Sequence, residues 1–88
     1  MRESQIENAL VKAVAVAGGE CRKVQWIGRR GAPDRLVLLP NGVIWWVELK
    51  APSKKPEPHQ EREHKRMRAM GQTVVVIDSL EQIERLLK

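Results

Sequence analysis

The chain has little of what secreted, membrane-spanning and base-stacking proteins depend on. It contains one cysteine, Cys21, three tryptophans, and neither tyrosine nor phenylalanine. A single cysteine forms neither an internal disulfide nor a zinc site, so a reducing cytoplasm is the expected compartment. The low aromatic content argues against a base-stacking platform of the kind that single-strand binders use. No apolar run approaches the ~20 residues that span a bilayer, and Glu3 and Glu7 interrupt any signal-peptide pattern at the N-terminus.

What the chain has in excess is positive charge on a short length. Its 88 residues carry 16 lysines and arginines against 11 acids, which gives a net charge of +5 and a sequence pI of about 9.9. This length predicts a single domain over residues 1–88. The basic balance favours a polyanionic partner, and DNA fits better than a membrane. A chain this short buries only about 60–65% of its unfolded surface, so a homodimer would add stability.

Hydrophobic periodicity and turn residues predict the order α-β-β-β-α-β-α, a mixed β-sheet flanked by helices in the α/β class. Gly18 and Gly19 end the first helix, Gly71 ends the second, and Ser79 with Gln82 forms a capping box for the third. The last strand is apolar at every position and is expected to be buried on both faces. The expected helices cover 2–17, 58–70 and 80–87, and the expected strands cover 20–27, 34–39, 43–50 and 73–77.

The two central strands are joined by Pro-Asn-Gly at 40–42, which predicts a type I turn with a glycine bulge. In a three-residue loop of this kind Leu39 pairs with Val43, and counting back places Asp34 opposite Glu48. Lys50 shares the face of Glu48 because the two are separated by one residue in a strand. A two-residue Asn-Gly turn would shift the register by one and separate the three charges.

Two acids opposite each other destabilise a sheet, so Asp34 and Glu48 need a reason to be neighbours. A divalent cation between them would supply one, because Mg²⁺ is held by a few carboxylates together with water and phosphate oxygens. Lys50 beside that cation could orient a water or stabilise charge on phosphorus, which is the chemistry of phosphodiester hydrolysis. The other interpretation of the spacing is a solvated strand end with one Glu–Lys pair.

The ordered motifs identify a family. The sequence reads G-A-P-D at 31–34, V-E-L-K at 47–50 and glutamine at position 60, between an opening helix and the closing V-V-V-I-D-S. This set resembles the PD-(D/E)xK nuclease superfamily and, more narrowly, the VRR-NUC family, over nearly the whole chain. The resemblance implies a restriction-endonuclease-like fold. Family members of this minimal length resemble phage proteins, which implies a bacterial or phage-host cytosol.

The resemblance also implies roles for individual residues. It makes Asp34 and Glu48 ligands of Mg²⁺ or Mn²⁺, together with the carbonyl of Leu49, and it makes Lys50 catalytic. Gln60 matches the glutamine that opens the helix after the E-x-K motif and is expected to point into the site.

An acidic residue on the first helix often completes the site in related nucleases. Glu7 is the expected ligand here, with Glu3, one turn earlier, as the alternative. The ordinary interpretation of both is a solvated charge near the helix N-terminus.

The remaining charged and polar motifs are less specific. His59 and His64 are five residues apart, so they do not form the i, i+4 pair of a zinc protease. DNA-binding residues are expected in two loops that flank the acids, where glycine or proline accompanies paired cations. These residues are Arg29, Arg30, Lys54 and Lys55. In each case the alternative is a solvated surface charge.

The sequence therefore predicts a stand-alone, Mg²⁺- or Mn²⁺-dependent endonuclease, and the family resemblance implies cleavage that leaves a 5′-phosphate and a 3′-hydroxyl. The family resemblance implies a homodimer acting on branched DNA such as a four-way (Holliday) junction, with no membrane partner. A nickase for flaps or duplexes is the alternative within the same class. A non-catalytic DNA-binding module on the same fold, or a regulatory protein that binds an acidic partner, are the alternatives from other classes.

Overall fold

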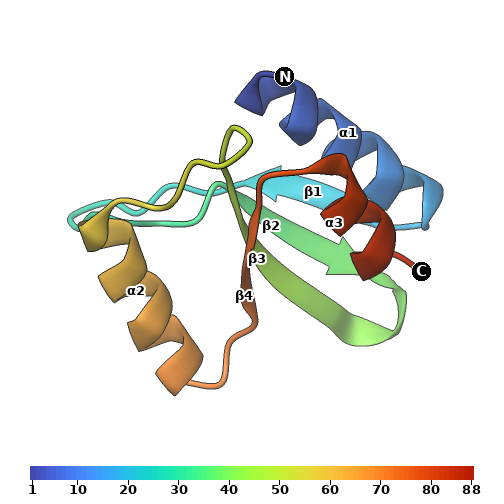
Figure 1. Ribbon diagram of the computed structural model, residues 1–88. Helices are drawn as coiled ribbons and strands as arrows, with labels where there is room; N and C mark the ends of the chain where they lie inside the picture. The colour runs from blue at the N-terminus through green and yellow to red at the C-terminus, as the bar shows by residue number, and fades with distance from the viewer.

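The computed structural model describes residues 1–88 and contains a four-stranded mixed sheet with helices on both sides (Figure 1). The predicted order and fold class are confirmed. No helix has both the length and the apolar character needed to cross a membrane. The helices are α1 (Glu3–Val16), α2 (Pro58–Ala69) and α3 (Leu80–Leu86), and the strands are β1 (Glu20–Lys23), β2 (Arg35–Leu39), β3 (Val43–Leu49) and β4 (Val74–Ile77).

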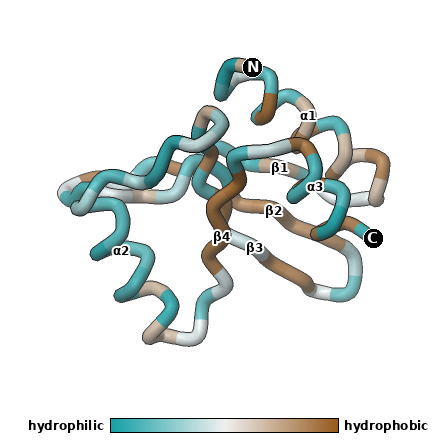
Figure 2. The backbone as a smooth tube through the Cα atoms, in the orientation of Figure 1, coloured by the Kyte–Doolittle hydropathy of each residue, from teal (hydrophilic) through white to brown (hydrophobic).

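The sheet has the strand order β1-β2-β3-β4, antiparallel except for the parallel pair β3–β4. Helices α1 and α3 lie together on one side of the sheet, whereas α2 stands apart from them on the other (Figure 1). Strands β2, β3 and β4 form the apolar centre of the molecule, and α2 is mostly hydrophilic (Figure 2). Helix α2 therefore brings polar side chains to this face of the sheet, and Asp34 and Glu48 lie on the same face.

The core lies between the sheet and the pair α1 and α3. Helix α1 buries the stripe that the periodicity predicted, and alternate residues of β2 and β3 face it. Each such aliphatic side chain contributes roughly 1.5–3 kcal/mol when fully buried. The buried members are Ile6, Leu10, Val14, Val37, Val47, Leu49, Ile77 and Ile83.

The predicted hairpin register is confirmed, but the predicted turn type is wrong. Leu39 pairs with Val43, and the ladder runs back through Arg35 opposite Val47. Asn41 has a φ of 68° and a ψ of 22°, a left-handed conformation that the second central residue of a type I turn does not adopt. Asparagine tolerates this region better than other non-glycine residues, so the loop keeps its three-residue length with a different backbone.

The predicted strand 20–27 is too long, because β1 ends at Lys23. The amide of Val24 still donates to the carbonyl of Asp34 at 3.1 Å, and the chain then leaves the sheet. Trp26 crosses to α2, where its indole Nε1 donates to Glu63 at 2.7 Å. A long-range bond from this side chain thus ends a strand whose local pattern would have continued.

Strand β4 bears out the expectation of burial on both faces in part. Ile77 is fully buried in the core with α1 and α3, and Val74, on the opposite face by alternation, is buried too. Val75 and Val76 are half-buried because β4 is the last strand of the sheet. The capping box of α3 is present, with the amide of Gln82 donating to Oγ of Ser79 and the Gln82 side chain accepting in return.

Candidate active site

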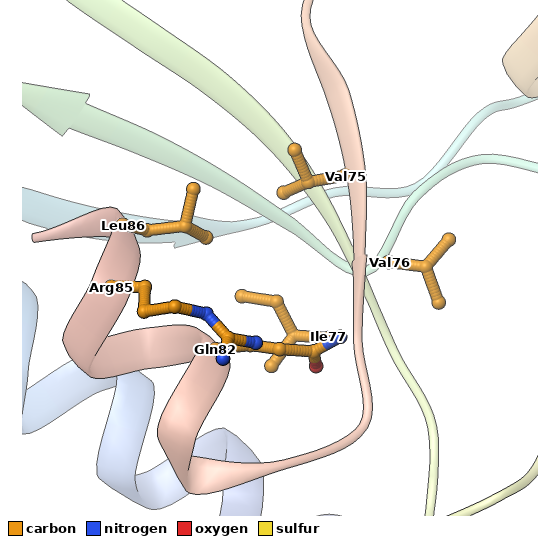
Figure 3. Close-up of a pocket in the computed structure, with 6 residues that line it drawn as sticks. All are labelled: Val75, Val76, Ile77, Gln82, Arg85 and Leu86. Carbon is orange, nitrogen blue, oxygen red and sulfur yellow. The ribbon is translucent and has the colours of Figure 1, made fainter.

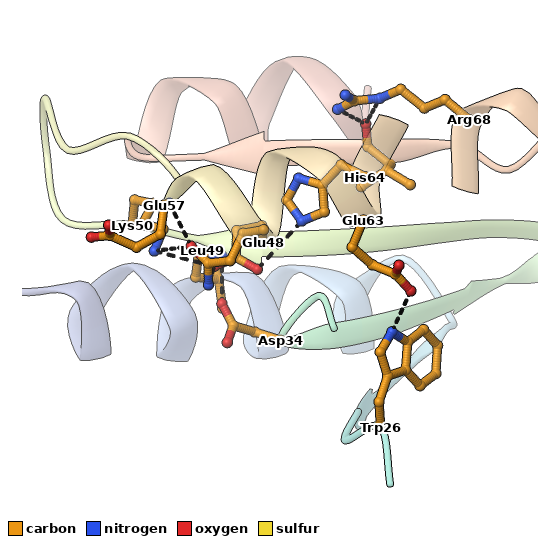
Figure 4. Close-up of polar contacts among 11 residues, drawn as sticks. Trp26, Asp34, Glu48, Leu49, Lys50, Glu57, Glu63, His64 and Arg68 are labelled. Atoms are coloured by element: carbon orange, nitrogen blue, oxygen red, sulfur yellow. Dashed lines mark hydrogen bonds and ion pairs between the residues drawn. The ribbon is translucent and has the colours of Figure 1, made fainter. Parts of the chain in front are cut away.

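The start of β2 and the end of β3 bring the two predicted acids together. The amide of Asp34 donates to the carbonyl of Val47 at 2.9 Å, which extends the ladder by one residue and places Asp34 beside Glu48. Oδ2 of Asp34 then accepts from the amide of Leu49 at 2.8 Å. The carboxylate of Asp34 is thereby fixed by the backbone of the strand that carries Glu48 (Figure 4).

Glu48 is the most unusual charge in the molecule. Its residue is 1% exposed, and its pKa is raised to about 7. Burial is the largest cause, the negative charge of Asp34 is the second, and Lys50 opposes both. The alternation of β3 turns Glu48 toward α2 and turns Val47 and Leu49 into the apolar core. The sheet register therefore holds a carboxylate pair in which one member resists ionisation.

Gln60, in the first turn of α2, joins the remaining predicted residues into one network. Its Nε2 donates to Oε2 of Glu48 at 2.9 Å, and its Oε1 accepts from Nζ of Lys50 at 2.9 Å. The same oxygen accepts from the amide of Glu57 at 2.8 Å as part of the α2 capping box. Nζ of Lys50 also lies 3.3 Å from Oε2 of Glu48. The prediction that Gln60 points into the site is confirmed.

The donor set fits a hard divalent cation. Oε1 of Glu48 is buried and accepts no hydrogen bond, and the like charge of Asp34 disfavours ionisation of Glu48. A cation bound by both carboxylates would relieve both costs, and carboxylate and carbonyl oxygens are the ligands that Mg²⁺ and Mn²⁺ prefer. No group of three or more histidine, cysteine or acidic side chains is arranged so that it could hold a metal ion. The carbonyl of Leu49 lies between Glu48 and Lys50 in the chain, where the family resemblance places a further ligand.

The two acids of α1 differ in their surroundings. Glu7, the expected ligand, accepts from Nε of Arg35 at 2.8 Å through its Oε2, and both side chains are mostly buried. Glu3, the alternative, contributes its negative charge to the raised pKa of Glu48, although Asp34 and burial contribute more. The geometry thus commits Glu7 to an ion pair and leaves Glu3 as the helix acid whose charge reaches Glu48.

The segment that contains Trp26 and the glycine-arginine loop, residues 28–31, is anchored to α2 at three points. The side chains of Trp26 and Arg29 reach Glu63, the latter at 3.0 Å, and Gly31 approaches the helix so closely that a Cβ there would lie 2.8 Å from the carbonyl of His59. Gly31 also has a φ of +93°, which favours glycine. Arg30 is exposed and makes no ion pair, as is the case for Lys54 and Lys55 in the loop after β3. Of the four predicted DNA-binding residues, Arg29 alone is engaged within the protein.

Sequence reasoning missed two buried residues of α2 near the site, Glu63 and His64. Glu63 is buried, yet its pKa is lowered, because hydrogen bonds from Arg66 and Trp26 and the charge of Arg29 outweigh the effect of burial. His64 is buried beside Glu48. The helical spacing of Gln60, His64 and Met67 already indicated a shared face, and that face does point at the sheet.

An apolar pocket of about 270 Å³ lies elsewhere, between β4 and α3 (Figure 3). Its two polar side chains come from α3, and none of the predicted site residues lines it. The pocket is therefore not part of the candidate active site. The lining residues are Val75, Val76, Ile77, Gln82, Arg85 and Leu86.

Comparisons with known proteins agree with this geometry. A scan against models of protein families finds no match. The chain is 54% identical over 79 residues to "Putative nuclease p44" of Acyrthosiphon pisum secondary endosymbiont phage 1, covering 90% of this chain and 85% of the relative. It also resembles a solved structure described as "VRR_NUC domain", with a TM-score of 0.90 and 44% identity over 97% of this chain and 92% of the other.

Proposed function

The chain belongs to the VRR-NUC nuclease family, and we propose that it is a metal-dependent endonuclease that hydrolyses phosphodiester bonds in branched DNA. The observation that carries the proposal is the buried pair Asp34 and Glu48 with Lys50 and Gln60 bonded to it. A domain that only bound DNA would gain nothing from keeping a destabilised carboxylate in this position. The pair makes physical sense as a cation site.

Asp34, Glu48 and the carbonyl of Leu49 would hold Mg²⁺ or Mn²⁺, with an acid of α1 as a further ligand. The charges around Glu48 favour Glu3 as that ligand, because Glu3 acts on Glu48 whereas Glu7 already pairs with Arg35. When bound, the metal would neutralise charge on the scissile phosphate and lower the pKa of a coordinated water.

Lys50 and Gln60 act on the attacking water and on the phosphate. Gln60 fixes Nζ of Lys50 within 3.3 Å of the Glu48 carboxylate, so the ammonium group is aimed before substrate arrives. From there Lys50 can donate to a phosphate oxygen as negative charge grows, or orient the water. Attack of the water on phosphorus with cleavage of the bond between phosphorus and the 3′ oxygen would leave a 5′-phosphate and a 3′-hydroxyl.

The basic loops supply the attraction for DNA. Arg30, Lys54 and Lys55 are exposed cations without ion-pair partners, so they can exchange counterions for phosphates. Both loops extend from the site toward the N-terminal end of α2 (Figure 1). This arrangement would guide a phosphate backbone across the acids, in the cytosol of a bacterial host.

A homodimer is proposed because part of one sheet face lacks a cover. Beyond α2, the side of the sheet opposite α1 presents Leu36 and Leu38 with Ile44, which is 48% exposed, and Trp46. An apolar patch of this kind marks a protein interaction surface. A second copy would cover it and supply the second active site that the paired nicks of a four-way junction need.

The deciding experiment compares cleavage of a labelled four-way junction, a flap and a linear duplex, each with Mg²⁺ or Mn²⁺. Wild type is tested beside Asp34→Ala and Lys50→Ala, and Glu84→Gln and Lys12→Met serve as matched controls on exposed positions of α3 and α1. Nicking near the branch that both site substitutions and chelation abolish, and that both controls retain, would support the proposal.

Two other results would redirect it. Equal cleavage of flap and linear duplex would make the protein a nickase with another preference. Tight junction binding without cleavage in either metal would make it a binding module on a nuclease fold.

A further inference from the structure

His64 and Glu48 meet in a buried contact that the proposed chemistry does not use. Both residues are 1% exposed. Nε2 of His64 lies 3.7 Å from Oε1 of Glu48, and each of these two atoms is buried without a hydrogen-bond partner (Figure 4). A buried polar atom left unpaired costs roughly 1–3 kcal/mol. Two such atoms facing each other indicate an interaction that another state of the site completes.

The two oxygens of Glu48 are held from different sides. Gln60 and Lys50 approach Oε2, whereas His64 alone approaches Oε1. Moving Nε2 and Oε1 about 0.7 Å closer would bring them to the ~3.0 Å of an ordinary N–H···O hydrogen bond.

The surroundings of His64 favour its neutral form. His64 is 1% exposed, so a charged imidazole there would be costly, and Lys50 already places a positive charge 3.3 Å from the same Glu48 carboxylate. A neutral imidazole with its proton on Nε2 can donate to a carboxylate without adding a positive charge that would repel a metal ion. A lysine or arginine in this place would compete with the metal.

We propose that His64 is a positioning residue: its Nε2–H group donates to Oε1 of Glu48 and fixes that carboxylate for metal binding. The proposal rests on the proposed metal-dependent function and names a group outside the motifs that defined the site. Groups that orient metal ligands in this manner alter metal affinity by about 10–100-fold when removed. The alternative is that His64 only fills space between α2 and the sheet.

The first test measures Mn²⁺ binding by calorimetry on purified full-length protein. His64→Met keeps the volume without the donor, His64→Gln keeps an N–H donor, and His59→Met is the matched control on the same helix. We expect His64→Met to weaken Mn²⁺ binding by about 10–100-fold, with His64→Gln and His59→Met within about threefold of wild type. Equal affinity in wild type and a folded His64→Met protein would overturn the proposal.

The second test needs no substitution of His64. Nitrogen-15 NMR of wild type reports which imidazole nitrogen of His64 carries the proton. The Nε2–H tautomer is expected, and adding Mg²⁺ should shift the Nε2 resonance in wild type and leave it unchanged in Asp34→Ala. An Nδ1–H tautomer would overturn the proposal, because Nε2 could then donate nothing to Glu48.

A double-mutant cycle separates this proposal from the proposed function. In metal-free protein, His64→Met should lower Tm at least twice as much in wild type as in Glu48→Met, because methionine at position 48 offers no oxygen to accept from the donor. Purely additive Tm changes would overturn the role of His64. Failure of wild type to bind Mn²⁺ would overturn the metal-dependent function instead, and the tautomer and the cycle would still decide the role of His64.

Discussion

Two glutamates, Glu48 on β3 and Glu63 on α2, are both buried in this small protein, at 1% and 4% exposure, and they differ in nearly everything else. Glu63 accepts hydrogen bonds from Trp26, Arg29 and Arg66, and its pKa is lowered. Glu48 has one oxygen without a partner, a second acid beside it and a pKa raised to about 7.

The difference teaches that burial alone does not distinguish a structural acid from a functional one. The number of positive and hydrogen-bond-donating partners does. Glu63 is fully satisfied within the protein and ties the loop of Arg29 to α2. Glu48 is left partly unsatisfied in the metal-free protein, with one carboxylate oxygen that accepts no hydrogen bond.

The sharpest way to test this contrast is to neutralise Glu48. Glu48→Gln should lower the cleavage rate by at least on the order of 10²–10³-fold. The bound metal would lose an anionic ligand, and the developing negative charge would lose part of its stabilisation. The same substitution should leave the metal-free protein as stable as wild type at pH 8, or more stable, because it removes a buried negative charge that Asp34 repels. Cleavage rates and urea unfolding of the same preparation measure both. Loss of stability together with loss of activity would contradict the contrast.

Neutralising Glu63 should have the opposite outcome. Glu63→Gln should lower the free energy of unfolding by about 1–3 kcal/mol, because it weakens the hydrogen bonds of Trp26 and leaves Arg29 and Arg66 without their anion. The cleavage rate of the folded fraction should stay within about tenfold of wild type. Denaturant unfolding measures the first and assays well below Tm measure the second. A fall in cleavage as large as that of Glu48→Gln would assign Glu63 to the chemistry.

The pH dependence of stability should also separate the two acids. The folded pKa of Glu48 lies above its usual value of 4.5, so its protonated form stabilises the fold below pH 4.5. That contribution is lost as pH rises from 4.5 to about 7 and amounts to about 3 kcal/mol. The folded pKa of Glu63 is lowered, so its contribution is present above 4.5 and is lost as pH falls through the lowered value.

Urea unfolding of metal-free protein between pH 4 and pH 8 measures these slopes. Glu48→Gln should flatten the fall between 4.5 and 7, and saturating Mn²⁺ should reverse it in wild type. A slope that Glu48→Gln leaves unchanged would mean that another group carries it.

The smallest effects are expected from Arg29 and Arg30 in the glycine-arginine loop, residues 28–31. Of the two, Arg29 pairs with Glu63 and Arg30 makes no ion pair. Arg30→Gln should reduce the salt dependence of DNA binding by about one phosphate contact without changing stability, because Arg30 makes no ion pair. Arg29→Gln should lower the unfolding free energy by about 0.5–1 kcal/mol, because its ion pair with Glu63 is half-exposed. Fluorescence anisotropy at several salt concentrations and urea unfolding measure these effects. Interchanged results would reverse the assignment of the two arginines.

Much of the fold could be predicted from local features of the sequence. Periodicity located every helix and strand to within a few residues, and the three-residue loop fixed the register that sets Asp34 beside Glu48. The exceptions have identifiable causes. Strand β1 ends early because Trp26 bonds to Glu63, 37 residues away, and the turn adopts another backbone because Asn41 accepts a positive φ.

The site divides in the same manner. Asp34, Glu48, Lys50 and Gln60 follow one another along a hairpin and the next helix, so their order and spacing carried the information. Glu63 and His64 sit on α2 with no motif of their own, and only the docking of that helix shows which charge each one meets.

The sequence by itself determined the fold class, the hairpin register and the identity of the acids, because each depends on neighbours a few positions away or on a short ordered motif. Tertiary structure alone decided how those groups are solvated: which carboxylate would be paired with cations, which would be left with a bare oxygen, and that Glu7 would face Arg35. Burial and charge partners come from elements far apart in the chain. Ionisation follows from those partners, so the three-dimensional fold, more than the residue type, sets the state in which each acid is held.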